Sequence, residues 1–520
     1  MSAARDSPRP QPAAGQHRYS PLLRENLIEW REYQESIALK AVQKNTLVVL
    51  PTALGKTVIA LISLSILIEG GGKCIFLAPT RPLVHQHATS MRTFLNLPEE
   101  EIVEVTGEVD RSLRGDVYRK GRVIVSTPQV IDNDSDILEP MKDQVKVVIF
   151  DEAHRATGDY SYVAVAEFFS GSRIIATTAS PGSDRQRIDE IIRHLRIDHL
   201  EIRDEKSPDV VKYIKGMDIR QVRIRPSTQT TRIISSLREV MDDRIQKLNA
   251  FGFHIQGHSR KEILEIGDVI SQQIREGNPN FYAAMKYRTS AILVDYLIEF
   301  METQGALPFY EYFNEVRNRN AQSKALFKDA RMISVESATT SLLVQPLDVH
   351  TPKMAEVIRI LRHNGGKAIV FCHYRLTANL LANILRQEGF LCEKFIGQSD
   401  RKREKGMSQY DQASVLQEFR EGTIQVLVAT QVGEEGLDVP AADTVIFYEP
   451  VASEVRSIQR RGRTGRFARG NVYILTMEDS RDMAYYYSAI RKENRMKDVL
   501  NDDIRHGDRN AQQTMDSFWK

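Results

Sequence analysis

The chain has 520 residues, of which 42% are hydrophobic and 27% are charged. It is too long for a single ordinary core, so we expect about two to four soluble globular domains. Its 71 Lys and Arg and 69 Asp and Glu leave a formal net charge of only +2. The net charge of the whole molecule is therefore too small to attract a polyanion, and any nucleic-acid site must be a local basic surface.

The ends of the chain and its cysteines indicate the cellular setting. Residues 1–20 are rich in Pro, Ala, Ser and Gln and predict a disordered tail. Cys74, Cys372 and Cys392 lie in or beside apolar runs without the spacing of a metal site, which predicts buried thiols in a reducing compartment. The chain has no 18-residue apolar run, so we expect neither a membrane span nor a signal peptide.

An apolar run at Leu47–Leu50 ends at Pro51, and a helical pattern begins at Gly55 after a short loop of small residues. This order predicts a strand, a phosphate loop and a helix. The backbone of Ala53, Leu54 and Gly55 would face an anion, Lys56 would reach the β- and γ-phosphates of a nucleotide, and the Thr57 hydroxyl would ligate Mg²⁺. Leu50 stands where the full motif has glycine, so an ordinary βα turn is the alternative.

Gln34 lies on a predicted amphipathic helix upstream of this loop. Its amide could pair with N6 and N7 of adenine, whereas a plain surface glutamine is the alternative.

Further apolar strands are predicted at residues 73–77, 123–125, 145–150 and 173–177, separated by helical patterns. This alternation predicts a parallel sheet covered by helices on both faces. Asp151 and Glu152 follow the third of these strands, at the sheet end where the phosphate loop also lies. Asp151 is suited to bind Mg²⁺ through water, and Glu152 is suited to act as a base for the attacking water. His154 could couple nucleotide binding to the neighbouring domain.

A second αβ unit begins near Leu347, with predicted strands at residues 367–371, within 422–429, and at 444–447. It lacks a Gly-Lys-Thr sequence of its own. Gln459, Arg463 and Arg466 lie in a glycine-containing basic segment that could direct two guanidinium groups at one anion, although a solvated basic turn is the alternative. Between the two units, residues 225–340 carry helical periodicity and predict an inserted helical domain or a spacer.

Together these segments resemble the superfamily 2 helicases, in particular the branch of archaeal Hef and eukaryotic FANCM. The resemblance implies an α/β fold of two RecA-like parallel-sheet domains with an inserted helical domain. The boundaries that we expect are a disordered tail at 1–20, RecA-like domain 1 at 21–224, the helical insertion at 225–345, RecA-like domain 2 at 346–500 and a flexible tail at 501–520.

The resemblance also implies functional roles. Lys56, Asp151, Glu152, Gln459, Arg463 and Arg466 would be catalytic, with Arg463 and Arg466 as arginine fingers. ATP would be bound by Gln34, Ala53, Leu54, Gly55, Lys56, Thr57 and Asp438, and Mg²⁺ by Thr57 and Asp151. The residues implied along the DNA strand are Pro79, Thr80, Arg81, Thr106, Gly107, Thr127, Thr178, Ser180, Gln409 and Thr430.

Two departures from the family pattern qualify this expectation. Ala53 replaces the usual glycine and restricts the loop backbone, which would slow turnover. Many archaeal relatives continue into nuclease and helix-hairpin-helix domains, whereas this sequence ends first, so we expect no nuclease activity.

The last residues place Gln512, Met515, Phe518 and Trp519 at the spacing of a motif that binds the sliding clamp PCNA. One 3₁₀ turn would bring Met515 and Phe518 to the same side as an apolar plug. The alternative is that Phe518 and Trp519 pack back onto the second RecA-like domain.

The sequence therefore favours an ATP- and Mg²⁺-dependent 3′ to 5′ DNA helicase or translocase that acts on single-stranded and forked or branched DNA in replication-fork repair. It would work near the nucleoid in an archaeal-type cell or in the nucleus of a eukaryote. A double-stranded-RNA-dependent ATPase and a clamp-bound scaffold with a weak ATPase are the alternatives, because the fold alone does not select among them.

Overall fold

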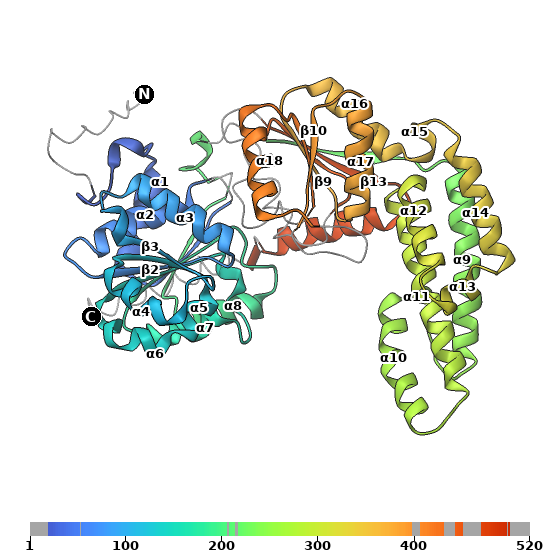
Figure 1. Cartoon of the computed structure of the whole chain (residues 1–520), viewed down its shortest axis with the longest axis horizontal. Coiled ribbons are helices and arrows are strands. Elements are labelled where there is room, and N and C mark those ends of the chain that lie inside the picture. The colour runs from blue at the N-terminus through green and yellow to red at the C-terminus, as the bar shows by residue number, and fades with distance from the viewer. Residues whose placement is uncertain are drawn as a thin grey trace, which may run out of the picture.

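The computed structural model describes residues 19–51, 54–204, 207–213, 217–397, 406–430, 442–450, 470–496 and 498–499. Two α/β domains lie next to each other, and a helical bundle projects from the second domain (Figure 1). The fold class expected from the sequence is confirmed. In the described part of the chain, no helix has the length and apolar character needed to cross a bilayer.

Domain 1 is built on a parallel sheet of seven strands in the order β3-β4-β2-β5-β6-β1-β7. The strands are β1 (Thr46–Val49), β2 (Lys73–Leu77), β3 (Ile102–Val105), β4 (Val123–Ser126), β5 (Val145–Asp151), β6 (Arg173–Thr178) and β7 (His199–Ile202). The inner strands are continuous apolar runs because helices cover both faces of the sheet. The four strands predicted after the phosphate loop are confirmed, whereas the short edge strands β3 and β7 were not predicted.

The helices of domain 1 divide between the two faces of the sheet. They are α1 (Glu32–Gln43), α2 (Lys56–Leu67), α3 (Arg81–Phe94), α4 (Arg111–Lys120), α5 (Pro128–Asn133), α6 (Ser135–Leu138), α7 (Ser161–Phe168) and α8 (Arg185–His194). Helices α1, α2 and α3 pack on one face with Val48 and Phe76. Helices α4 to α8 pack on the other face with Leu47 and Ile75. Short 3₁₀ helices connect these elements at η1 (Glu25–Leu27), η2 (Glu99–Glu101), η3 (Glu139–Gln144), η4 (Ala153–Arg155) and η5 (Val211–Tyr213).

Domain 2 has a parallel sheet of six strands in the order β10-β11-β9-β12-β13-β8. The strands are β8 (Met217–Ile224), β9 (Ala368–Phe371), β10 (Cys392–Phe395), β11 (Val426–Ala429), β12 (Thr444–Phe447) and β13 (Gly470–Met477). Its helices are α15 (Leu347–His350), α16 (Pro352–Asn364), α17 (Arg375–Gln387) and α18 (Gln409–Glu421). The three cysteines are free and buried, as expected.

The expected boundary between domain 1 and the insertion at residue 224 is wrong. Strand β8 pairs in parallel with β13 along its whole length, from Met217 opposite Gly470 to Ile224 opposite Met477. Residues 217–224 therefore belong to domain 2. The sequence gives no local signal of this, because the partner of this half-exposed edge strand lies far along the chain. At the other end, Ser20 is buried and its hydroxyl donates to the Ser65 carbonyl, so residues 19–20 belong to domain 1 rather than to a tail.

The insertion is helical, as expected. It comprises α9 (Thr228–Asn249), α10 (Arg260–Arg275), α11 (Phe281–Thr303), α12 (Ala306–Arg317), α13 (Ala321–Leu326) and α14 (Ala330–Leu343). Four of these helices begin at capping side chains, namely Ser227, Ser259, Asn320 and Asp329, each of which accepts a backbone N–H of the first turn. The bundle has an apolar core of its own in which α11 packs against α9 and α10.

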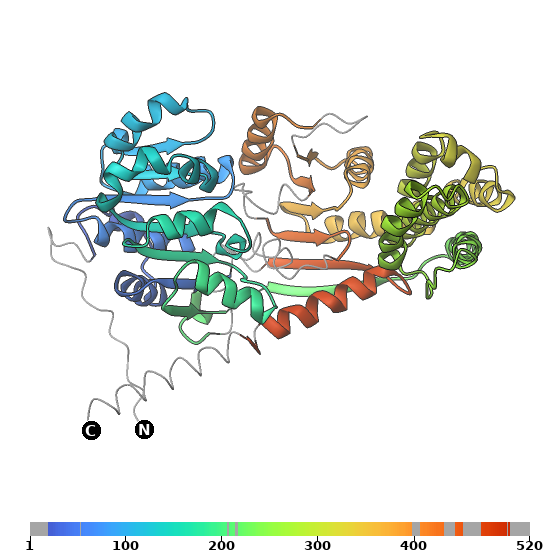
Figure 2. The same cartoon turned by 90° about the horizontal axis from the view of Figure 1, so that it is seen from below.

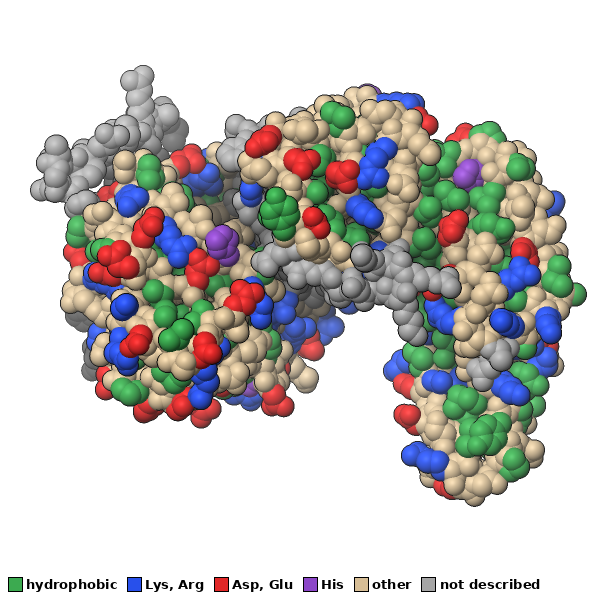
Figure 3. Space-filling view, viewed as in Figure 1, with side chains coloured by type: hydrophobic (Ala, Val, Ile, Leu, Met, Phe, Trp, Pro, Cys, Tyr) green, Lys and Arg blue, Asp and Glu red, His purple; other side chains and the backbone are tan. Residues whose placement is uncertain are grey.

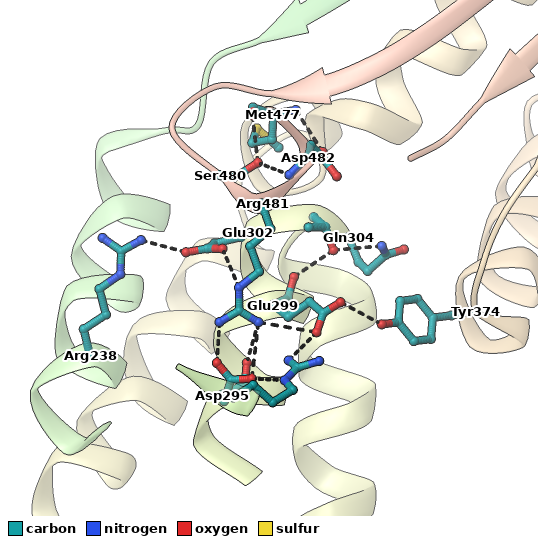
Figure 4. Close-up of polar contacts among 12 residues, drawn as sticks. Arg238, Asp295, Glu299, Glu302, Gln304, Tyr374, Met477, Ser480, Arg481 and Asp482 are labelled. Carbon is teal, nitrogen blue, oxygen red and sulfur yellow. Dashed lines mark hydrogen bonds and ion pairs between the residues drawn. The ribbon is translucent and has the colours of Figure 1, made fainter. Parts of the chain in front are cut away.

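A cluster of charged residues fastens the insertion to domain 2 (Figure 4). Arg481 follows β13 and forms ion pairs with Asp295, Glu299 and Glu302 of α11. Arg260 of α10 pairs with two of the same carboxylates. The side chains of the three acidic residues are at most 10% exposed, so the arginines replace the hydrogen bonds to water that the carboxylates lose on folding.

Hydrogen bonds from uncharged side chains of domain 2 extend the same attachment. Glu299 accepts from the Tyr374 hydroxyl at 3.2 Å. Thr377 donates to the side chain of Gln304 at 2.8 Å, and the Tyr448 hydroxyl donates to the Gln304 carbonyl at 2.8 Å. The end of α11 is thus part of the packing of domain 2.

Residues 481–496 form a helix that starts at this cluster and runs along domain 2 to domain 1 (Figure 2). At its start, Asp482 forms a buried ion pair with Lys353 of α16. At its end, Met496 packs into the core of domain 1, with its sulfur 2.9 Å from the Ser180 hydroxyl oxygen. The expected assignment of residues 346–500 to domain 2 alone is therefore wrong at its end, because residue 496 packs in the core of domain 1.

Candidate functional site

The site lies where three neighbouring strands of domain 1 end. Strands β5, β6 and β1 are consecutive in the sheet, and their registers place Asp151 beside Thr177 and Thr178 beside Val49. The backbone N–H of Leu50 donates to the Thr178 carbonyl at 3.0 Å. The segments after β1, β5 and β6 therefore meet at the carboxyl edge of the sheet, as expected for a parallel fold.

The phosphate loop turns into α2 at Gly55, whose φ of 82° lies in the left-handed region. Lys56 is the first residue of this helix, and its Nζ donates to the Leu50 carbonyl at 3.1 Å, so the ammonium lies over the loop. Thr57 follows in the first turn and is half-buried. A helix N-terminus with a lysine and a hydroxyl beside it is suited to bind an anion. Ala53 lies outside the described residues.

Gln34 lies against this loop and is not a surface residue. It is 3% exposed, and its Nε2 donates to the Leu54 carbonyl at 3.0 Å. Its Oε1 is buried and has no hydrogen-bond partner among the described residues. In this arrangement the amide offers an acceptor that suits the amino group of adenine, while its donor is used by the loop.

Asp151 is held by two donors at the end of β5. His87 Nε2 lies 2.9 Å from Oδ2, and the Thr177 hydroxyl donates to Oδ1 at 2.7 Å. Burial by itself would raise the pKa of this carboxyl, but the bonds from His87 and Thr177 and the charge of Lys56 outweigh it and lower the pKa to about 2. Asp151 is therefore an anion at neutral pH.

Glu152 has a different environment from its neighbour. Its backbone has φ 52° and ψ 49°, a left-handed conformation that costs a non-glycine residue on the order of 1–3 kcal/mol. Its Oε2 is buried 3.3 Å from His154 Nδ1 and accepts no hydrogen bond from the described residues. The side chain is thus aimed by a strained backbone, and one of its oxygens remains available as an acceptor.

His154 connects Glu152 to the next strand. Its Nδ1 lies 3.2 Å from the hydroxyl of Thr178, which in turn donates to the Ser180 carbonyl at 3.0 Å. Thr178 and Ser180 are both buried. In this conformation they link the acidic pair to Met496, and their predicted contact with a DNA strand stays a prediction.

The other residues predicted on the strand path of domain 1 follow β2, β3 and β4 at the same sheet edge. Arg81 begins α3, is exposed, and donates to Glu108 at 2.8 Å. Its guanidinium lies over Gly107, 3.3 Å from the position that a Cβ would take there. Half-exposed residues at the ends of these strands are Pro79, Thr80, Thr106 and Thr127. The structure thus brings these segments together, as the parallel topology requires.

Domain 2 contributes few described residues to the predicted site. Thr430 follows β11, is buried, and donates its N–H to the Phe395 carbonyl at 3.0 Å. Gln409 begins α18 after the capping residue Ser408, but its side chain is not described. The predicted residues Asp438, Gln459, Arg463, Arg466, Gln512, Met515, Phe518 and Trp519 lie outside the described residues.

Sequence reasoning did not identify His87, Thr177 and Tyr162, which surround Asp151. The Tyr162 hydroxyl donates to the backbone carbonyl of Asp151. One signal was available, because His87 shares the buried face of α3 with Leu83, Val84 and Met91. A polar residue at a core position of a helix predicts a buried partner.

Comparison with known proteins agrees with this geometry. The DEAD/DEAH box helicase family model matches residues 31–188, the helicase conserved C-terminal domain matches 352–468, and a helical-bundle model of ATP-dependent RNA helicases matches 230–345. The crystal structure of the Pyrococcus furiosus Hef helicase domain superposes with a TM-score of 0.71 at 39% identity, covering 90% of this chain and all of that one. The chain belongs to the Hef and FANCM branch of the superfamily 2 helicases.

Curated relatives of this family differ in their names. A Methanocaldococcus jannaschii protein, named as a candidate ATP-dependent RNA helicase, is 37% identical over 92% of this chain and 62% of its own length. The ATP-dependent DNA helicase mph1 of Neurospora crassa is 31% identical over 87% of this chain and 41% of its own length. Arabidopsis thaliana FANCM, named a DEAD-box ATP-dependent RNA helicase, is 34% identical over 88% of this chain and 36% of its own length. The chain thus spans less than two thirds of the length of these relatives.

Proposed function

We propose that this protein of the Hef and FANCM branch is an ATP-dependent 3′ to 5′ DNA translocase or helicase that acts on forked or branched DNA. The observation that carries the proposal is the attachment of the insertion to domain 2. Because α11 shares the ion pairs and hydrogen bonds of domain 2, the bundle moves with that domain. A duplex arm held by the bundle would then shift relative to domain 1 when the domains close on ATP.

The shape of the molecule supports this role. The bundle projects from domain 2 and leaves open space between its free end and domain 1 (Figure 3). Lys and Arg side chains are spread over its visible face, with Asp and Glu side chains and hydrophobic areas between them. Sequence-independent contact with phosphates would suit such a surface.

The hydrolysis chemistry follows from the groups at the sheet edge. Lys56 and the N-terminus of α2 would hold the phosphates, and Glu152 would orient or deprotonate the attacking water. Asp151, held as an anion, and Thr57 offer oxygen ligands at the same place, which fits Mg²⁺ bound mostly through water. Such an ion, when bound, neutralises developing phosphate charge. Gln459, Arg463 and Arg466 would complete the site from domain 2, and removing one finger would cost about 10³-fold or more in turnover.

The choice between DNA and RNA is tested by stimulation of the ATPase. We expect forked DNA to raise the hydrolysis rate of the full chain more than duplex RNA of the same length. We also expect displacement of a strand from a partial duplex with a 3′ single-stranded extension but not from one with a 5′ extension. Preferential stimulation by duplex RNA would overturn the DNA assignment and favour the alternative.

The role of the insertion is tested separately with Arg275, Lys286 and Lys328, which are exposed on the bundle. Reversing the three charges with R275E, K286E and K328E should reduce fork preference while leaving stimulation by single-stranded DNA within about twofold. Binding should also become less dependent on salt, because fewer phosphates are neutralised. An unchanged fork preference would reduce the insertion to a spacer.

We further propose recruitment to replication forks through the sliding clamp, by Gln512, Met515, Phe518 and Trp519. Titration of a peptide of residues 512–520 against the clamp, beside a peptide with F518A and W519A, tests this. We expect affinity on the order of micromolar for the first peptide only, because ordering a free segment offsets much of the aromatic burial. Equal or absent binding for both would contradict it. Intact Lys56 and Glu152 argue against an idle scaffold.

A further inference from the structure

His87 connects the helix of the predicted strand path to the metal carboxylate. Helix α3 starts at Arg81 beside Gly107, and its buried face carries His87 to Asp151 of β5. His87 Nε2 lies 2.9 Å from Asp151 Oδ2, with both side chains almost fully buried. The second turn of α3 thus contacts this carboxylate directly.

The imidazole is fixed independently of Asp151. Its ring packs on Phe76 of β2 with centroids 4.5 Å apart, and the residue is 4% exposed. Its Nδ1 is buried and has no hydrogen-bond partner among the described residues. A ring held in this way presents Nε2 in one direction only, toward Oδ2.

We propose that His87 is a positioning residue for ATP hydrolysis, which fixes the plane of the Asp151 carboxylate so that it meets the hydrated Mg²⁺ of the nucleotide. This inference rests on the proposed function of the site. Thr177 holds Oδ1, and His87 holds Oδ2. With both donors present, the carboxylate cannot rotate about its Cβ–Cγ bond, whereas with Thr177 alone it can.

A purely structural histidine would behave differently. An apolar residue would fill the space beside Phe76 equally well, and the packing of α3 does not require a donor. What an apolar residue cannot supply is the bond to Oδ2. Removal of a group that orients a metal ligand typically costs 10- to 100-fold in metal affinity.

The test compares the full-length wild type with H87A and H87Q. The glutamine amide nitrogen reaches roughly the place of Nε2, so H87Q keeps the donor without the ring. The control is M91A, because Met91 lies on the same buried face of α3, is fully buried and has no N–H or O–H group to donate to Asp151. It reproduces the loss of packing alone.

Two quantities are measured beside the unfolding temperature. One is the affinity for a fluorescent ADP with Mg²⁺ and with EDTA, and the other is the Mg²⁺ concentration that half-saturates ATP hydrolysis. For H87A we expect the Mg²⁺-dependent gain in ADP affinity to fall about tenfold or more, with ADP affinity in EDTA unchanged within twofold. The half-saturating Mg²⁺ concentration should rise by a similar factor, and H87Q should recover most of both.

The outcomes separate this inference from the proposed function. If the wild type hydrolyses ATP and K56A does not, the site assignment stands. Equal Mg²⁺ dependence for H87A and M91A would then overturn the role of His87 alone, as would failure of H87Q to recover either quantity. Absence of Mg²⁺-dependent ADP binding and hydrolysis in the wild type would overturn the proposed function itself.

Discussion

At the scale of single residues, two adjacent carboxylates are given different chemistry by their neighbours. Asp151 is held by His87 and Thr177 and stays ionised, with a pKa of about 2. Glu152 follows in a left-handed backbone, and its Oε2 accepts no hydrogen bond from the described residues. A fixed anion suits a cation, and an acceptor without a donor suits a water molecule.

The first prediction separates chemistry from folding. K56A and E152Q should each nearly abolish ATP hydrolysis, because the side chains act on phosphate and water rather than in the core. Phosphate release measures the activity, and thermal unfolding should change by no more than a few degrees. A rate within tenfold of the wild type for either variant would show that its residue is not catalytic.

The second prediction concerns Gly55 and the recognition of adenine. A Cβ at Gly55 would lie 2.2 Å from Gln34 Nε2, so G55A must displace the Gln34 side chain. We expect the ratio of kcat/KM for ATP over GTP to fall about tenfold, close to the loss of one hydrogen bond to a buried group. The matched control is G158A, since Gly158 also has a positive φ but has nothing within 4 Å of the added atom. An equal loss in both variants would assign the effect to backbone strain.

At the scale of elements, the helices of the insertion depend on their caps. Asp329 caps α14, accepting the backbone N–H of Arg331 at 3.1 Å. The Arg331 side chain donates to it at 2.7 Å, and Arg244 of α9 donates at 3.1 Å. One carboxylate therefore starts a helix and joins it to its neighbour.

The third prediction is that acid weakens this junction. The bond from the Arg331 side chain, together with its backbone bond and the charge of Arg244, lowers the pKa of Asp329 from 3.8 to about 2. The folded-state pKa lies below the unfolded value, so the stabilisation is complete above about pH 4 and is lost as the pH falls toward 2. D329N keeps the cap but removes the charge.

The stability difference between the wild type and D329N is measured by urea unfolding between pH 3 and pH 6. It should be constant at the upper end of this range and should shrink below about pH 4. A difference close to zero at every pH would show that the cap, which D329N keeps, rather than the charge, stabilises the junction. D329A supplies the comparison, because it loses both, and the cap alone is worth about 1 kcal/mol.

At the scale of the whole molecule, the helix of residues 481–496 joins all three parts. Its start holds the insertion through Arg481 and domain 2 through the buried pair of Asp482 and Lys353. Its end places Met496 in the core of domain 1 against Ser180. This helix therefore connects Ser180, at the carboxyl edge of domain 1, to α11 of the insertion by direct contacts at its two ends.

The fourth prediction concerns the ion pairs that Arg481 forms at the start of this helix. R481A leaves Asp295, Glu299 and Glu302 with less compensation in a buried place, which typically costs about 3–5 kcal/mol. R481K keeps the charge but loses the fork that reaches three carboxylates, so it should recover only part of the stability. Unfolding followed by urea gives both values. The exposed R225A, which removes one surface pair with Glu478, should cost no more than about 1 kcal/mol.

The sequence by itself determined the class of fold and most of the residues of the candidate nucleotide site that lie at the sheet edge of domain 1. Long apolar strands alternating with helices require a parallel sheet, and a parallel sheet gathers Lys56, Asp151 and Thr178 at one edge whatever the details of packing. The helical insertion could also be predicted, because helical periodicity is a local property of the chain.

Only the tertiary structure decided which distant segments meet. Strand β8 lies in the second sheet because it pairs with β13, which is far along the chain. His87 reaches Asp151 because α3 packs over β3 and β4 and directs this side chain past Phe76 of β2. From the sequence alone, the acidic residues of α11 would be placed on a solvent-exposed face of the helix. In the structure they are buried and form ion pairs with Arg481 and Arg260. Pairings of this kind depend on long-range packing, which leaves no periodic pattern in the sequence near either partner.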